Sequence, residues 1–188
     1  MRGRDKFYKA KSVLLFFSNS LKLLPFNLRV ILFNHSRNIQ GIKGLAIRYI
    51  LLRTIAKKCG DNVTIHTNVF LFNIQNLSLG DNISIHPMCY IDATGKITIE
   101  NDVSIANGTT IMTTTHTYKD TNIPIKDQIV EEMPVMIYNN VWIGARVTIL
   151  AGVNIFSGAI VGANSVVTKN VQGNTIVGGC PAKFIKVR

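Results

Sequence analysis

The sequence predicts an all-β solenoid preceded by an α-helical segment, and a six-residue repeat is the main reason. From Ile137 to Val171 an isoleucine or valine recurs every six residues. The fifth position of each hexad is Val, Ala or Ser, and the fourth is mostly Asn or Gly, which tolerate a positive φ at low cost. A short fixed period with an aliphatic residue at one phase and a turn-former at another is typical of a β-solenoid. Each hexad should supply one short strand and one corner.

The same repeat occurs earlier in the chain, with restarts. Its aliphatic positions are Ile65 and Leu71, then Leu79, Ile85, Ile91 and Ile97, then Ile99, Ile105 and Ile111. Each restart adds two residues, which predicts coils of about eighteen residues with an occasional widened corner, stacked at the inter-strand spacing of ~4.8 Å. An amphipathic helix is excluded, because its apolar residues recur at spacings of three and four. An ordinary β-sandwich is the alternative all-β fold.

The N-terminal third has a different pattern, which predicts two helices over residues 6–34 and 43–58. Apolar residues follow helical spacing in both, and the first run is broken near Pro25. We therefore divide the chain into a basic amphipathic helical segment (1–58) and a solenoid domain (59–188) with a loop excursion at 117–134.

The net charge of +11 is concentrated in this first segment. Residues 1–58 hold thirteen of the 21 Lys and Arg and a single acid, Asp5. One interpretation is contact with an anionic membrane surface, where each basic side chain contributes about 1 kcal/mol. The other is that the helices cover the open end of the solenoid. Nucleic acid is not expected, because no aromatic-interleaved basic strand or known binding module accompanies the charge.

The remaining composition suggests a protein of a reducing compartment. Cys59, Cys89 and Cys180 are odd in number and widely spaced, which predicts neither a disulfide framework nor a zinc site. Cys89 falls on a fifth position of the repeat and should be a small core residue. No signal peptide or membrane-spanning run is recognisable. We expect a cytoplasmic location, peripheral on the inner membrane face if the basic helices bind lipid.

The repeat is interrupted once, between Ile111 and Ile137, and this break predicts the functional site. Insertions in a solenoid emerge as loops on one face and commonly carry binding functions. His116 ends the run Thr113-Thr-Thr-His at the root of the excursion. A histidine where a rigid coil meets a loop is a candidate catalytic residue.

Several motifs together resemble the hexapeptide-repeat acyltransferases, in particular the maltose and galactoside O-acetyltransferases and the polysaccharide O-acetyltransferases. These motifs are the hexads, the single loop after His116, the stretch Asn139-Asn-Val-Trp-Ile-Gly144 and the ending Gly178-Gly-Cys-Pro-Ala-Lys183. The resemblance covers residues 59–188. It implies a left-handed parallel β-helix of triangular section, a homotrimer with active sites between neighbours, acetyl-CoA as donor, and no metal.

The resemblance also implies roles for individual residues at the reacting centre. His116 matches the family's catalytic histidine, and a neutral imidazole suits removal of a proton from a hydroxyl near pH 7. The backbone amide of Ala145 matches the donor that stabilises the oxyanion. Trp142 matches an aromatic residue of the cleft; alternatively it is a bulky residue on an outer face.

Further matches concern coenzyme A. Gly162 and Ala163 match positions that contact the pantetheine arm, and Thr168 and Lys169 match a pair near the nucleotide. Lys183 and Lys186 lie where the family's basic residues meet the CoA phosphates, although a single lysine is commonly only solvated.

The chain departs from the family where the acceptor would bind. One coil before the histidine, the sugar acetyltransferases have an acceptor-contacting asparagine, whereas this chain has His86, with Asp92 nearby. His86 either contacts the acceptor or lies at an outer corner. The family's usual N-terminal segment is also replaced by the basic helices, so the resemblance leaves the acceptor open.

The leading hypothesis is therefore an acetyl-CoA-dependent O-acetyltransferase that acts on a sugar hydroxyl of a surface polysaccharide or its lipid-linked precursor. Within the same class, the acceptor could be an amino sugar (N-acetylation), an antibiotic or serine. A γ-type carbonic anhydrase is a different class, for which His66, His86 and His116 would be the metal ligands. A catalytically inactive scaffold is the third possibility.

Overall fold

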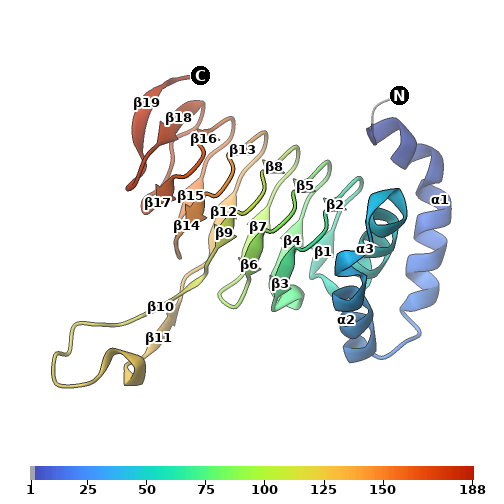
Figure 1. Ribbon diagram of the computed structural model, residues 1–188, viewed down its shortest axis with the longest axis horizontal. Helices are drawn as coiled ribbons and strands as arrows, with labels where there is room; N and C mark the ends of the chain where they lie inside the picture. The colour runs from blue at the N-terminus through green and yellow to red at the C-terminus, as the bar shows by residue number, and fades with distance from the viewer. Residues whose placement is uncertain (1–2) are drawn as a thin grey trace.

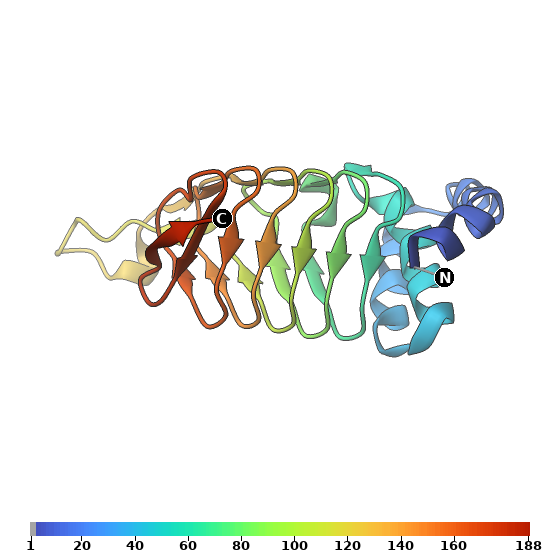
Figure 2. The same ribbon diagram turned by 90° about the horizontal axis from the view of Figure 1, so that it is seen from above.

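In the computed structural model, which describes residues 3–188, short strands stack into three parallel sheets that form the sides of a solenoid (Figures 1 and 2). Sheet 1 contains β1 (Lys58–Cys59), β4 (Leu77–Leu79), β7 (Ile97–Ile99), β12 (Val135–Ile137) and β15 (Asn154–Ile155). Sheet 2 contains β2 (Thr64–Ile65), β5 (Ser84–Ile85), β8 (Ser104–Ile105), β13 (Trp142–Ile143), β16 (Ile160–Val161), β18 (Thr175–Gly178) and the antiparallel β19 (Lys183–Val187). Sheet 3 contains β3 (Phe70–Phe72), β6 (Tyr90–Asp92), β9 (Thr110–Ile111), β14 (Thr148–Ile149) and β17 (Val166–Val167). The predicted solenoid is confirmed.

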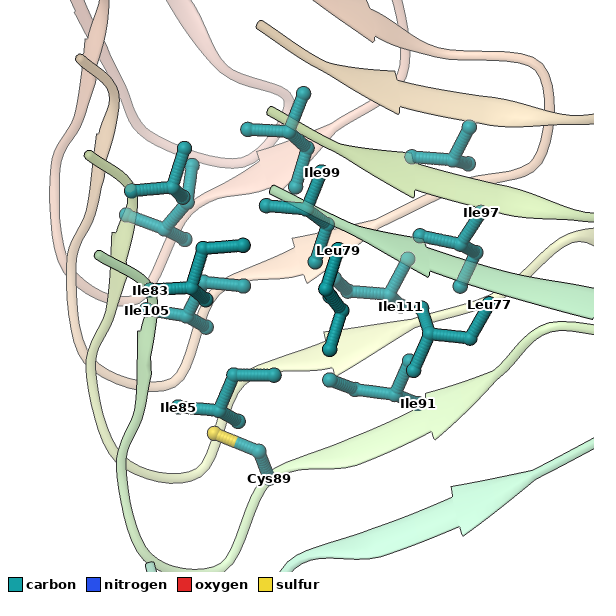
Figure 3. Packing of buried hydrophobic residues seen from close by; sticks show 14 of the residues in the cluster. Leu77, Leu79, Ile83, Ile85, Cys89, Ile91, Ile97, Ile99, Ile105 and Ile111 are labelled. Carbon is teal, nitrogen blue, oxygen red and sulfur yellow. The ribbon is translucent and has the colours of Figure 1, made fainter. Parts of the chain in front are cut away.

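The aliphatic positions of the repeat form the interior of the solenoid. Every first position of a hexad from Ile65 to Val167 is at most 6% exposed. Figure 3 labels several of these side chains, among them Leu79, Ile85 and Ile105, packed together in the interior. Cys89 lies among them and is fully buried, as predicted. The fourth-position residues make the corners: φ is positive at Asn140, Arg146, Gly152, Gly158 and Asn164. The fifth-position residues from Val141 to Val171 are buried beside them.

The restarts of the repeat have a different structural cause from the predicted widened corner. In sheet 1 the strands β4, β7 and β12 each bury two side chains, for example both Ile97 and Ile99. The two extra residues therefore lengthen one side of the triangle. In a coil that contains such a strand, Thr64 is paired with Ser84, twenty residues later. In a later coil, Met136 is paired with Asn154, only eighteen residues later.

Within residues 3–188, three helices precede the solenoid: α1 (Gly3–Leu21), α2 (Phe26–His35) and α3 (Gly41–Ile55), with a 3-10 turn η1 (Ser36–Asn38) between the last two. The predicted first helix is thus two helices that meet at Pro25, whose fixed φ and missing N–H suit a position just before a helix. The predicted second helix ends at Ile55 instead of residue 58, because Lys58 already belongs to β1.

The helices lie over the open end of the solenoid, as the capping interpretation expects. Figure 1 shows α3 beside β1 and β2, with α1 outside it. Leu51, Leu52 and Ile55 of α3 belong to the same buried cluster as the first coil. Ion pairs join the two parts: Asp61 lies against Lys11 and Arg53, and Arg4 lies 3.3 Å from Asp102. Part of the basic excess is therefore used within the molecule.

The excursion is more ordered than a loop over 117–134. Its two ends pair as antiparallel strands, β10 (Thr114–His116) and β11 (Val130–Glu132), and a short 3-10 turn η3 (Ile125–Asp127) lies between them. Figure 1 shows this arm projecting away from the solenoid.

Among residues 3–188, no helix is long and apolar enough to span a membrane.

We expect Ile105→Ala to lower the free energy of unfolding by about 3 kcal/mol, because truncating a fully buried isoleucine removes transfer energy and leaves a cavity. Urea denaturation of both proteins gives the difference. Ile129→Ala, at a side chain 75% exposed on the arm, is the matched control and should change stability by less than about 0.5 kcal/mol. Equal losses in the two variants would contradict the assignment of the interior.

Candidate functional site

His116 is the last residue of β10, where the arm leaves the solenoid. It pairs with Val130 across the arm, and its side chain is exposed. Among the described residues, no hydrogen-bond partner restrains its ring nitrogens. The imidazole is therefore held by a short strand pair and is open to a ligand.

The root of the arm is fixed to rigid coils by Thr113, which is fully buried. Its Oγ1 accepts a hydrogen bond from the backbone N–H of Gly95 and donates one to the carbonyl of Asp92, both at 2.8 Å. The N–H of Met133 donates to the carbonyl of Thr113, which ties the returning strand to the same point. Sequence reasoning missed Thr113 as a positioning residue, although a threonine two residues after the interior Ile111 was a signal.

Asp92 lies at this same corner, but its carboxylate is already engaged. Oδ1 accepts hydrogen bonds from the N–H and the hydroxyl of Thr94, at 3.1 and 2.6 Å, and from the amide of Asn73 at 3.3 Å. These contacts shape the corner from which the arm emerges. Asp92 therefore supports the site's backbone, and its predicted contact with the acceptor stays a prediction.

A second group of predicted residues lies at the corner between sheets 2 and 3. Ala145 and Ala163 occupy equivalent positions in successive coils, and within residues 3–188 neither backbone N–H has a hydrogen-bond partner. A Cβ at Gly144 would lie 2.6 Å from the nitrogen of Ala163, so this position requires glycine for the coils to approach. Asn107 has the same unpaired N–H one coil earlier, so the free donor is a property of this corner.

Sheet 2 adds side chains beside these donors. Trp142 on β13 is 55% exposed, between Ser104 and Ile160 of the neighbouring strands. Lys183 and Lys186 are exposed on β19, and neither forms an ion pair with a carboxylate of the described chain. An aromatic surface, free N–H groups and cations therefore occur on one side of the molecule.

The predicted site residues consequently form two separate groups. The corner between sheets 3 and 1 carries Asp92, His116, Thr168 and Lys169. Sheet 2 and its corner with sheet 3 carry His86, Trp142, Ala145, Gly162, Ala163, Lys183 and Lys186. One side of the triangle, about six residues or roughly 20 Å, separates them. A single chain does not bring His116 against Ala145, so a site that uses both groups requires a second chain.

His86 takes part in a histidine stack. Its ring lies 4.7 Å from that of His66, with an interplanar angle of 12°. Burial lowers the pKa of His66, and the neighbouring His86 and Arg48 lower it further, so His66 is mostly neutral near pH 7. His116 lies at the other corner, so the three histidines do not converge within the chain. In residues 3–188 no group of three or more His, Cys, Asp or Glu could hold a metal ion.

Comparison with known sequences finds acetyltransferases. A family model described as the hexapeptide repeat of succinyl-transferase matches residues 134–169. Galactoside O-acetyltransferase of Escherichia coli is 29% identical over 82% of this chain and 73% of its own length. A protein of the same organism named as a lipopolysaccharide biosynthesis O-acetyltransferase is 34% identical over 67% of this chain and 58% of its own. A Saccharomyces cerevisiae protein named as an acetyltransferase is 33% identical over 72% of this chain and 68% of its own.

Solved structures agree with these relatives. A galactoside acetyltransferase in complex with coenzyme A has a TM-score of 0.76 and 26% identity, over 86% of this chain and 80% of that one. A hexapeptide-repeat-containing acetyltransferase from Vibrio cholerae, complexed with acetyl-CoA, has a TM-score of 0.73 and 26% identity, over 94% of this chain and 87% of that one.

We expect the pKa of His66 to lie below 6.5, because burial disfavours the protonated form and the neighbouring His86 and Arg48 lower the pKa further. Since the unfolded chain then binds this proton more readily, stability should fall as the pH drops from 6.5 through the folded pKa and level off below it. His66→Gln should reduce this slope in urea denaturations at several pH values. His35→Gln, at an exposed position on α2, is the matched control, and an unchanged slope in His66→Gln would contradict the shift.

Proposed function

We propose, from the premise that this chain belongs to the hexapeptide-repeat acetyltransferases, that it transfers the acetyl group of acetyl-CoA to a hydroxyl group of a sugar. The dependence on acetyl-CoA is a property of its relatives and structural neighbours as a group. The observation that carries the proposal for this chain is the position of His116, at the end of an ordered strand pair rooted in rigid coils.

In the proposed reaction the imidazole of His116 removes the proton from the acceptor hydroxyl. The acceptor oxygen attacks the thioester carbonyl carbon, the carbon–sulfur bond breaks, and the CoA sulfur leaves with the proton returned by His116. The transient negative charge on the carbonyl oxygen requires a fixed donor. The unpaired N–H of Ala145 supports this role, because no group of the described chain competes for it.

We further propose that the site is built between two chains of a homotrimer. His116 would come from one chain, and Trp142 and Ala145 from its neighbour. The separation of the two residue groups at different corners supports this arrangement, since within one chain a whole side of the triangle lies between His116 and Ala145.

The residues on sheet 2 and at its corner with sheet 3 fit the donor substrate, acetyl-CoA. Small residues at Gly162 and Ala163 leave the coil backbone accessible, and the free N–H of Ala163 is available to an amide carbonyl of the pantetheine arm. Lys183 and Lys186 offer unpaired cations for phosphate groups. Thr168 and Lys169 lie at the other corner and would contribute from the chain that carries His116.

For the acceptor, we propose a surface polysaccharide or its lipid-linked precursor. The similarity to a protein named for lipopolysaccharide biosynthesis supports this class. His86 would face the acceptor next to the cleft. A panel of labelled acetyl-transfer assays with neutral sugars, amino sugars, serine and chloramphenicol tests the acceptor class directly. Preferential acetylation of an amine or of serine would replace the sugar hydroxyl by that acceptor.

We also propose that the enzyme is cytoplasmic and binds the inner membrane face through its helical segment. Several large apolar side chains there are exposed, including Phe16 at 67% and Leu23 at 88%. Lys9, seven residues before Phe16 on α1, and Lys22, adjacent in sequence to Leu23, are also exposed and have no carboxylate partner among the described residues. Exposed apolar and basic side chains in one segment suit an anionic bilayer.

His116→Ala should lower the rate of CoA release with a sugar acceptor by a factor of about 10²–10⁴, because the acceptor hydroxyl loses its base. A thiol-detecting assay measures CoA release, and light scattering checks that the trimer is retained. His35→Ala is the control histidine, exposed on α2, and should leave the rate unchanged. Turnover retained by His116→Ala would reject the assignment.

Mixing variants tests whether the site spans two chains. Ala145→Pro removes the backbone donor proposed for the oxyanion, so trimers of this variant alone should be inactive. Co-assembly of Ala145→Pro with His116→Ala chains restores interfaces in which both groups are native. Recovery of part of the activity is expected, and no recovery in mixed trimers would contradict the shared site.

The double variant Phe16→Asp, Leu23→Asp should weaken binding to phosphatidylglycerol vesicles at least about tenfold, because it removes two apolar side chains and adds negative charge. Vesicle co-sedimentation measures this. Point variants are preferable to removing residues 1–58, since Leu52 and Ile55 also cover the first coil. Ile129→Asp on the arm is the control; equal effects of the two changes would reject the helical surface as the contact.

A further inference from the structure

A cavity of about 710 Å³ lies between the helices and the first two coils, on the opposite end of the solenoid from the last coils. Its helical side carries the apolar residues Phe7, Ala10 and Leu14 of α1 and Leu45 of α3, and also basic residues. Its solenoid side is polar, with Thr64 and Ser84 among its lining. None of the residues assigned to acetyl transfer lines this cavity. A volume of this size accommodates a small organic ligand.

The cavity contains a buried cation without an anionic partner. Arg48 is 1% exposed, and the hydrogen bonds of its guanidinium within residues 3–188 all go to neutral carbonyls. Nε donates to Ile65 at 2.7 Å, and Nη1 donates to Ser36 at 2.7 Å, to Ile39 at 2.9 Å and to Arg37 at 3.5 Å. In the described chain no carboxylate pairs with it, and burial lowers its pKa with no acidic neighbour to offset this. Its Nη2 has no hydrogen-bond partner within residues 3–188, and protein atoms do not enclose this nitrogen completely. A buried charge is ordinarily compensated by an opposite charge.

A second cation lies in the lining of the same cavity. Lys6 on α1 is exposed and forms no ion pair with another described residue, whereas its neighbour Arg4 is already paired with Asp102. The helical wall of the cavity therefore combines apolar side chains with one fixed guanidinium and one ammonium unpaired among the described residues, and the solenoid wall carries hydroxyl groups. A guanidinium and an ammonium group together carry two positive charges. They match the two negative charges of a phosphate monoester better than the single charge of a carboxylate ligand.

We propose that this cavity binds an amphipathic phosphate, with the phosphate at Arg48 and Lys6 and an apolar chain along Phe7, Leu14 and Leu45. The carbonyl contacts of Arg48 hold the guanidinium in place for the ligand as well as joining η1 to β2. The proposal is independent of the acetyl-transfer reaction, because its residues and its test involve binding alone.

Octyl phosphate is a probe that contains both proposed parts of the ligand. In isothermal titration calorimetry with the full-length protein, it should bind at least about ten times more tightly than octyl glucoside, which has the same chain without charge, and than inorganic phosphate, which has the charge without the chain. Equal affinity for octyl phosphate and octyl glucoside would overturn the anion site. Equal affinity for octyl phosphate and inorganic phosphate would overturn the apolar part. Binding that requires vesicles and is absent with monomeric octyl phosphate would reassign the signal to the membrane surface.

Two variants test whether the probe binds in this cavity. Neither alters Arg48, because losing its side chain would also remove the hydrogen bonds that join η1 to β2. Lys6→Glu removes the free cation, and Ala10→Phe fills the apolar side; each should weaken octyl phosphate binding at least about fivefold. Lys57→Glu, the same charge reversal at an exposed position after α3 and outside the cavity lining, should change it less than twofold. Arg48→Lys, checked for folding by urea denaturation, should weaken binding if it remains folded. Unchanged affinity in both Lys6→Glu and Ala10→Phe, or an equal loss in Lys57→Glu, would overturn the proposal.

Discussion

The whole molecule depends on the stacking of aliphatic side chains inside a narrow triangular tube. Each inward side chain lies on the equivalent side chain of the next coil, because parallel pairing of the strands fixes the register. Ile65, Ile85, Ile105 and Ile143 form one such row, and all are fully buried. The interior therefore accepts only a narrow range of shapes. The outward side chains and the corners are free of this constraint, and the candidate site is made from them.

The arm can project from the solenoid because the stacking continues past it. Val135 pairs with Ile97 and Ile143 with Ile105, although the whole arm lies between these coils in the sequence. The insertion occupies one corner, where its ends are fixed by Thr113 and paired with each other. An exposed loop tip is thus combined with a positioned histidine, which suits the catalytic base proposed above.

The helical segment solves a problem that the solenoid creates at its first coil, whose strand edges and interior would otherwise be exposed. α3 covers that end, and Arg48 donates to a carbonyl of β2 that has no preceding coil beside it. The same segment retains surface apolar groups, unpaired lysines and a cavity. The proposed membrane contact and the proposed phosphate binding would therefore involve different parts of the segment that covers the end.

Sequence alone determined the solenoid, its interior positions, its positive-φ corners and the place of the arm, because each is a local consequence of a six-residue period. It also identified the family, and it indicated His116 as a candidate catalytic residue. Only the tertiary structure decided that the extra residues lengthen sheet 1, that the arm begins as paired strands, that Asp92 is engaged within its own corner, and that Arg48 is buried without an anion. These features depend on which coils and helices become neighbours. The separation of His116 from Ala145 also depends on the tertiary structure. The six-residue period repeats identically on every side of the triangle, so the period alone does not show at which corner a residue lies.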